Sequence, residues 1–408
     1  MADAPYDPFD DFNRSHAIGL IRDPYPRLAE LRRERSVQKM TLQEMVGDPS
    51  HEPGAPNDIY SVLSHETVSR VLLDGETFSS AGYARSVGPV FGHSILEMDE
   101  PEHSRYRGLI QKAFNKRELD RWEHELVKPI VNRMIDRFAA RGHADLVREL
   151  TFPFPVSVIA GMIGVDEADL TDFHRMATEL ISITIDPARG IRASQGLREM
   201  FARMLPGRRQ APRDDLMSVL AAAELDGTKL DDDAIYAFLR LLAPAGAETT
   251  YRSLSNLLLG LFQHRDQLDA LRADRALMPQ AIEEGLRWEP PLLGIARTTT
   301  REVEIDGVVL PAGTSISVNL GAANRDEARF PDPDVFDIFR PQKTNVAFAT
   351  GAHRCLGLHL ARMESTVALN TLFDRLPNLR LDPAAEDIHI SGLTFRSPLS
   401  LPVLFDPA

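Results

Sequence analysis

The sequence is poor in cysteine, with a single one, Cys355, among 408 residues. One thiol cannot form a disulfide within the chain or build a four-cysteine zinc or iron-sulfur site, which leaves packing, nucleophilic catalysis or an axial metal ligand. Long apolar runs are also lacking, because none reaches the roughly 18 residues of a membrane span. The acidic amino-terminal residues lack the basic start and apolar core of a signal peptide. The sequence therefore predicts a cytoplasmic protein without a membrane anchor.

Positive charge is scarce as well. The chain has 46 lysines and arginines against 60 acidic residues, a net charge of -14, which disfavours non-specific binding to nucleic acid. Hydrophobic residues make up 43% and charged residues 26%, as in ordinary globular proteins. No long polar linker or low-complexity tract divides the chain. We therefore expect a single domain over residues 1–408, and a monomer.

The spacing of apolar residues predicts a mainly α protein with small β-sheets, an α+β fold. Helical spacing extends over 119–261, with connections expected at 153–155, 186–187, 206–207 and 226–227. After Arg301 the period changes to two, which predicts short strands in hairpins around the turn Asp306-Gly307. The residues before Asp23 read as an irregular lead, and the Gly/Pro-rich loop at 46–58 suggests no function.

The neighbours of Cys355 favour a metal ligand. Cys355 lies in the run 348–357, immediately before a helical stretch that begins at Leu358. Gly351 and Gly357 would let a flat cofactor approach the backbone closely, and a helix N-terminus favours thiolate over thiol. Taken alone, a buried structural cysteine is the stronger reading, since free cysteine is among the most buried residue types.

This run resembles the ligand motif of the cytochrome P450 family, Phe-Gly-x-Gly-x-His/Arg-x-Cys-x-Gly, from Phe348 to Gly357. The resemblance implies the cytochrome P450 fold, with haem b, iron protoporphyrin IX, between a long distal helix and a proximal cysteine-bearing helix. It implies Cys355 as the iron ligand and Phe348 and Gly357 as cofactor neighbours. Ala349 departs from the motif, and alanine tolerates the positive φ of a glycine turn poorly.

A second motif lies within a predicted helix over about 232–263, whose interior contains Pro244, a residue that costs about 3 kcal/mol relative to alanine there. The Thr249 hydroxyl can reach back to the Ala245 carbonyl and open the helix locally. For this segment alone, a kink that only serves packing is an equal alternative.

The segment resembles the oxygen-binding helix of the same family, which implies Glu248 and Thr249 as the acid and alcohol beside dioxygen and Ala245 beside the haem. Splitting dioxygen heterolytically requires protons. A hydroxyl can donate a hydrogen bond there, while a carboxylate relays protons through water.

Two further sets of residues match the family. Glu284 and Arg287 would otherwise be an ordinary helical surface pair, but with Arg340 they resemble a buried structural network. Haem carries two propionates that need cations, and the matching positions, for which solvated surface charge is the alternative, are His103, Arg107, Arg297 and His353.

The predicted function is a haem-thiolate monooxygenase that inserts one oxygen atom from dioxygen into a hydrophobic small molecule. Electrons are expected from an external ferredoxin-type partner and its reductase, since the chain has no flavin domain and too few cysteines for an iron-sulfur cluster. The alternatives are a peroxide-driven peroxygenase, a haem-binding sensor, and a cysteine hydrolase using Cys355 with His353. A basic stretch over 103–117 without carboxylates, together with Arg354, is the expected docking surface for an acidic ferredoxin.

The residues expected around the substrate are apolar, which favours terpenoid, steroid, fatty acyl or aromatic compounds over sugars or nucleotides. They are Val87, Val90, Phe91, Ile183, Leu241, Leu292, Leu293, Ile295 and Phe395. Arg85 is a possible anchor for a substrate carboxylate, although loop arginines more often face solvent.

Overall fold

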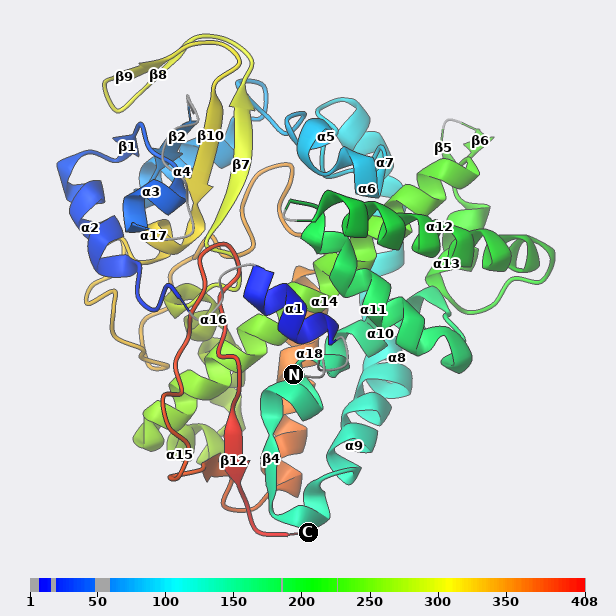
Figure 1. The fold of residues 1–408 in the computed structure, drawn as a ribbon, viewed down its shortest axis with the longest axis vertical. Helices are drawn as coiled ribbons and strands as arrows, with labels where there is room; N and C mark the ends of the chain where they lie inside the picture. Colours follow the sequence, from blue (N-terminus) through cyan, green and yellow to red (C-terminus); the bar gives the residue numbers. More distant parts are fainter. Residues whose placement is uncertain (1–6, 16–19, 48–58, 185, 226, 408) are drawn as a thin grey trace, which may run out of the picture.

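The computed structural model describes residues 7–15, 20–47, 59–184, 186–225 and 227–407. Most of the Gly/Pro-rich loop at 46–58 therefore lies outside the described residues. Helices dominate, as predicted, and the largest sheet lies toward one side of the molecule (Figure 1).

The α-helices are α1 (Pro8–Ser15), α2 (Tyr25–Glu34), α3 (Leu42–Val46), α4 (His65–Leu73), α5 (Tyr83–Ser86), α6 (Gly88–Phe91), α7 (Glu102–Gln111), α8 (Lys116–Trp122), α9 (Lys128–Asp136), α10 (Pro153–Ile163), α11 (Leu170–Leu180), α12 (Pro187–Gln210), α13 (Leu216–Ala222), α14 (Asp232–Gln263), α15 (Arg265–Ala273), α16 (Met278–Trp288), α17 (Leu320–Asn324) and α18 (Leu358–Arg375). Short 3-10 turns are η1 (Lys112–Phe114), η3 (Ala139–Arg141), η5 (Glu167–Asp169), η6 (Ile181–Thr184) and η7 (Arg275–Leu277), and π-helical turns are η2 (Glu123–Val127) and η4 (Val147–Thr151).

The strands are β1 (Val37–Gln38), β2 (Ile59–Val62), β3 (Phe78–Ser79), β4 (His143–Asp145), β5 (Glu224–Leu225), β6 (Thr228–Lys229), β7 (Gly294–Thr299), β8 (Val303–Ile305), β9 (Val308–Leu310), β10 (Ser315–Asn319), β11 (Arg380–Leu381) and β12 (Pro402–Leu404). A five-stranded sheet has the order β1-β2-β10-β7-β3, in which only the β2–β10 pair is parallel. A three-stranded sheet joins β11, β12 and β4, and the predicted hairpin around Asp306-Gly307 is the pair β8–β9.

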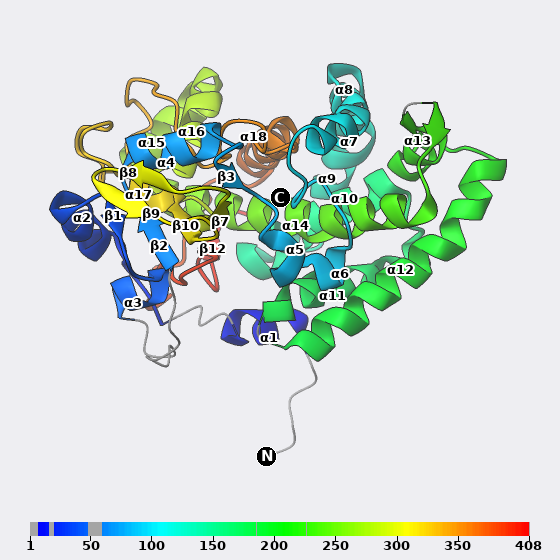
Figure 2. The ribbon, with the colours of Figure 1, turned by 90° about the horizontal axis from the view of Figure 1, so that it is seen from above.

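Helix α14 is the axis of the helical half, and its bounds, Asp232 and Gln263, agree with the prediction. Its residues are mostly buried in the largest hydrophobic cluster, which also contains residues of α1, α6 to α13, α15, α16 and α18. Figure 2 shows α14 between α12 on one side and α18 on the other. A helix buried this completely can place side chains from its middle inside the protein.

Two expectations about local structure were wrong. The lead before Asp23 contains α1, whose Phe9 and Phe12 are buried against the rest of the protein. The expected break at 206–207 is absent, because α12 continues through Pro206 to Gln210. Packing stabilises this end of α12, where Leu205 is buried and Arg208 donates to Asp215.

Among the described residues, we find no helix that combines the length and the apolar character needed to span a bilayer.

Candidate active site

The loop before Cys355 is held by backbone hydrogen bonds. The Cys355 amide donates to the Phe348 carbonyl at 2.9 Å, and the Ala349 amide donates to the Val346 carbonyl at 2.9 Å. Ala349 adopts a φ of 53°, the left-handed conformation that the glycine of the family motif would supply. Gly351 also has a positive φ, and a Cβ there would lie 2.2 Å from the Leu72 carbonyl oxygen. The turn is therefore kept despite the alanine.

Cys355 is partly buried at the start of α18, near several positive groups. The Gly357 amide bonds its sulfur, and Arg107, Arg354 and Arg362 favour the thiolate, but burial outweighs them and raises the pKa of the thiol. The helix N-terminus favours the thiolate through the Gly357 amide, as expected, but in the polypeptide by itself it does not offset burial. A bound metal would favour the deprotonated sulfur directly.

The three predicted structural residues lie together in one hydrogen-bonded network. Arg287 of α16 donates from Nε and Nη2 to the two oxygens of Glu284, each at 2.7 Å, and Arg340 Nε donates to Glu284 at 3.3 Å. The two arginines also donate to the Val335 carbonyl. All three side chains are largely buried. Each charged group of the network is therefore paired, and the two arginines hold the Val335 backbone in the segment that leads into the cysteine loop.

The middle of α14 has the geometry expected from its sequence. The Thr249 hydroxyl donates to the Ala245 carbonyl at 2.9 Å. Ala245 is exposed although the helix around it is buried. Glu248 is almost fully buried and accepts a hydrogen bond from Arg252 Nη2 at 3.2 Å. Burial raises the pKa of Glu248, and Arg252 opposes that shift.

Arg252 was not singled out from the sequence, although its place one turn after Glu248 was the available signal. It is completely buried, and it also donates to Ser397 Oγ at 2.9 Å and to Asn13 Oδ1 at 3.3 Å. Asn13 belongs to α1, which crosses in front of α14 in Figure 1. Both ends of the chain therefore help to hold the Glu248 carboxylate.

Two histidines and two arginines lie close to the cysteine loop. The rings of His103 and His353 lie 4.0 Å apart between centroids, and buried His103 Nε2 has no hydrogen-bond partner. Burial, with His103 and Arg297 nearby, lowers the pKa of His353 to about 3. Arg297 and Arg107 have no carboxylate partner within 4.0 Å among the described residues.

These residues fit a flat cofactor that carries anionic groups. The orphaned His103 nitrogen and the unpaired Arg297 suit carboxylates such as propionates. A Cβ at Gly357 would meet nothing within 4 Å, so the backbone beside Cys355 has room for a planar ring. Arg107 instead donates to the Arg354 carbonyl, next to the cysteine.

The predicted pocket residues fall into separate groups. Five of them belong to or pack against the helical core: Val87, Val90, Phe91, Ile183 and Leu241. Ile295 packs against the cluster below the five-stranded sheet, and Leu292 and Phe395 pair as an isolated β-bridge. Leu293 is fully buried in a third cluster with Tyr25 and Leu28. The structure thus brings the α6 and α14 residues into one core and places Leu293 in another.

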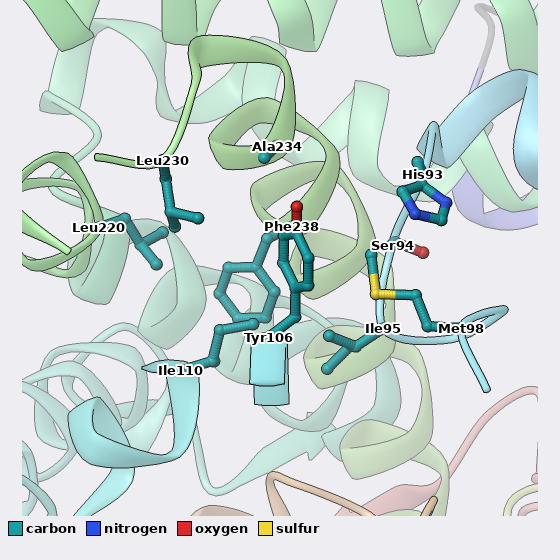
Figure 3. A pocket seen from close by; sticks show the side chains of 10 residues that line it. All are labelled: His93, Ser94, Ile95, Met98, Tyr106, Ile110, Leu220, Leu230, Ala234 and Phe238. Carbon is teal, nitrogen blue, oxygen red and sulfur yellow. The ribbon is translucent and has the colours of Figure 1, made fainter. Parts of the chain in front are cut away.

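A small hollow beside α14 is distinct from these groups (Figure 3). It is open to solvent at one side and is lined by His93, Ser94, Ile95, Met98, Tyr106, Ile110, Leu220, Leu230, Ala234 and Phe238. Most of these side chains are apolar, and none is a predicted pocket residue. His93 at its rim contacts Glu97 and Glu102 at 2.7 and 2.9 Å.

Comparison with known proteins agrees with this geometry. Residues 168–388 match the family model described as Cytochrome P450. The chain is 36% identical to Cytochrome P450 107B1 of Saccharopolyspora erythraea over 346 residues, covering 81% of this chain and 85% of that protein. It is 36% identical to the Steroid C26-monooxygenase of Mycolicibacterium smegmatis over 364 residues, covering 86% of this chain and 89% of that protein.

Among solved structures, Cytochrome P450 CYP109Q5 from Chondromyces apiculatus superposes with a TM-score of 0.85 at 35% identity, covering 96% of this chain and 97% of that one. The fold, with its long central helix and small sheets, is accordingly the cytochrome P450 fold. The chain belongs to the cytochrome P450 family, and it is a haem-dependent monooxygenase.

Proposed function

We propose that this enzyme binds haem b through Cys355 and inserts one oxygen atom from dioxygen into a hydrophobic small molecule, with electrons from a ferredoxin-type partner and its reductase. The observation that carries the proposal is the Cys355 loop, in which the family turn is preserved around the single thiol of the chain. The haem, when bound, supplies the redox centre at which dioxygen is activated. We infer that residues 1–408 form one domain for this task.

The side chains of the site have separate roles in this proposal. Thr249 holds its hydroxyl in a fixed direction through the Ala245 carbonyl, and its oxygen can still accept a hydrogen bond from water. Glu248 holds a proton at its carboxylate oxygen more readily than an exposed glutamate, because burial raises its pKa. His103, Arg297 and His353 orient the cofactor by binding its carboxylates.

The substrate is an apolar molecule in this proposal. Val90, Phe91 and Ile183 are buried apolar side chains whose contact with a ligand would contribute about 25 cal/mol per Å² of apolar area. A relative named as a steroid monooxygenase supports an apolar substrate. The Glu248–Thr249 pair favours a dioxygen route over a peroxygenase, because peroxide already carries the protons and electrons that such a pair manages.

The test of the cofactor assignment is the spectrum of the reduced protein with carbon monoxide. Thiolate ligation should give a strongly red-shifted Soret band in the parent protein, and Cys355→Ser should lose it. His359→Ala, at an exposed position of α18 four residues after Cys355, serves as the control and should keep the band. A histidine-type spectrum of the folded parent would reject the assignment.

We also propose that the electron donor docks on the basic surface that includes Lys112, Lys116 and Arg354, all exposed. Lys116 is paired with Asp120 at 2.8 Å, so its charge is partly compensated, and the Lys112 side chain is exposed. Lys112→Glu should slow reduction by an acidic ferredoxin and weaken the salt dependence of its rate. The control is Lys229→Glu in the β5–β6 hairpin, and equal reduction rates for both variants would refute the docking surface.

A further inference from the structure

Three arginines share an unusual environment. Burial lowers the pKa of Arg107, Arg240 and Arg297, and none of them has a carboxylate within 4.0 Å among the described residues. Arg297 is buried, and Arg107 and Arg240 are partly buried, whereas the fully buried arginines Arg252 and Arg287 are paired with glutamates. Withdrawing a guanidinium from water without an anion is costly unless a ligand supplies the anion.

Two members of this set lie at the proposed haem site, where Arg107 bonds the carbonyl next to Cys355 and Arg297 faces His353. There the carboxylates of the cofactor suit Arg297, and the Cys355 sulfur is the negative group next to Arg107. Arg240 lies elsewhere, on α14 and one residue before Leu241 of the proposed pocket. It therefore requires a different anion.

The contacts of Arg240 place its guanidinium where α6, α12 and α14 meet. Its Nε donates to the Tyr236 carbonyl at 3.2 Å, and its Nη1 donates to Ser194 Oγ of α12 at 2.9 Å. Ser194 in turn donates to the Val90 carbonyl of α6 at 2.6 Å. All of these partners are neutral, and they hold the arginine in one orientation.

The remaining donors of Arg240 point toward the loop after α6. Its Nη2 lies only 2.8 Å from the position that a Cβ would take at Gly92, whose φ is 80°. Glycine is therefore required there for the backbone conformation and for the close approach of the guanidinium. No acceptor among the described residues bonds Nη2. The sequence signal was a lone charge in the apolar run Phe238-Leu239-Arg240-Leu241-Leu242.

The nearest opposite charge does not neutralise Arg240. Asp233 interacts with it only at longer range, and Asp233 Oδ1 already accepts a hydrogen bond from Arg198 at 2.8 Å. Arg198 also repels the Arg240 guanidinium. The local field is thus positive next to the apolar side chains of Val90 and Phe91.

We propose that Arg240 binds an anionic group of the substrate, so that the substrate is an amphipathic acid with an apolar body and a carboxylate. The planar guanidinium matches a carboxylate with two parallel hydrogen bonds. This inference rests on the proposed function, since it places the apolar body of the same ligand among the pocket residues. It replaces Arg85, which is exposed on α5, as the anchor.

The test uses pairs of ligands that differ only in the charged group. Dodecanoate is compared with 1-dodecanol, a C24 steroid acid with its alcohol, and a biphenyl carboxylate with its alcohol. Binding is measured by the spin-state shift of the haem and independently by calorimetry. For at least one pair, the acid should bind the parent protein about tenfold more tightly than the alcohol, which corresponds to about 1.4 kcal/mol.

Arg240→Met should abolish this preference while it leaves the alcohol affinity within about twofold, and Arg240→Lys should keep part of the preference. Arg85→Met is the matched control and should bind like the parent. If no acid binds more tightly than its alcohol, or if Arg240→Met weakens both equally, the inference is overturned. A failure of the haem assignment would appear in the carbon monoxide spectrum. Calorimetry measures ligand binding whichever residue binds the iron, so the two failures can be told apart.

Discussion

The cysteine loop and the middle of α14 carry the two halves of the proposed site, and they are held in different ways. The loop is fixed by its own backbone hydrogen bonds, and the Glu284 network holds the segment upstream of it through the Val335 carbonyl. The acid on α14 is fixed by Arg252, which in turn donates to Asn13 and Ser397 near the two ends of the chain. Local geometry thus shapes one half and long-range contacts shape the other.

The difference indicates where each half is vulnerable. A change in the Glu284 network should act mainly on stability, because the network touches no proposed substrate or oxygen residue. A change around Glu248 should act mainly on proton handling, because the buried pair lies next to Thr249. The following substitutions separate the two halves, in order of decreasing effect.

Arg287→Met should have the largest effect, a decrease of about 3–5 kcal/mol in the free energy of unfolding, because it leaves Glu284 buried without its main partner. Chemical denaturation measures this change. Arg27→Met is the control, since the Arg27–Glu30 pair is exposed and should contribute less than about 0.5 kcal/mol. A loss below about 1 kcal/mol for Arg287→Met would show that the network does not support the loop.

Arg252→Met should destabilise the protein by about 2 kcal/mol and raise the pKa of Glu248 further, because Arg252 is what opposes the effect of burial. For a carboxyl whose folded-state pKa is raised, stability is highest below the unfolded-state pKa and falls as pH increases toward the folded-state value. Because Arg252→Met raises the folded-state pKa of Glu248 further, the free energy of unfolding of the variant should continue to fall up to a higher pH than that of the parent.

The infrared C=O band of protonated Glu248 reports the protonation of this carboxyl directly. The band should persist to higher pH in Arg252→Met than in the parent. Glu248→Gln identifies the band by removing it. Identical titrations of the band in parent and variant would mean that Arg252 does not control the Glu248 proton.

Thr249→Ala should leave folding and substrate binding nearly unchanged but divert electrons to peroxide or water. The expected basis is loss of the hydroxyl that the Ala245 carbonyl orients. The quantity to measure is product formed per reduced nicotinamide consumed, with Thr249→Ser as the control that keeps the hydroxyl. Unchanged coupling in Thr249→Ala would remove this residue from the proposed mechanism.

Ala349→Gly should have the smallest effect, an increase in stability of less than about 1 kcal/mol. Glycine relieves the left-handed strain at a φ of 53°, but it loses the contact of the Ala349 methyl with the cluster below the sheet and gains entropy in the unfolded chain. Ala352→Gly, in the same loop without a positive φ, should instead decrease stability. Equal effects of the two substitutions would argue against strain at Ala349.

Much of the fold could be predicted because its signals are local. The bounds of α14, the hairpin β8–β9 and the helix after Cys355 follow from apolar periodicity and turn residues. The helix at 8–15 was missed, since a short amphipathic segment gains its stability from docking rather than from propensity. The continuation of α12 through Pro206 was missed because contacts with other segments, and not local propensity, stabilise that end of the helix.

The sequence by itself determined the family, the single thiol and the acid–alcohol pair, because each depends on residue type and on spacing along one helix or loop. Only the tertiary structure decided which charges are paired. Arg252 and Arg240 lie twelve residues apart on one helix and look alike in the sequence. One meets Glu248, Asn13 and Ser397, and the other meets only neutral groups, because pairing depends on which distant segments fold against each face of α14.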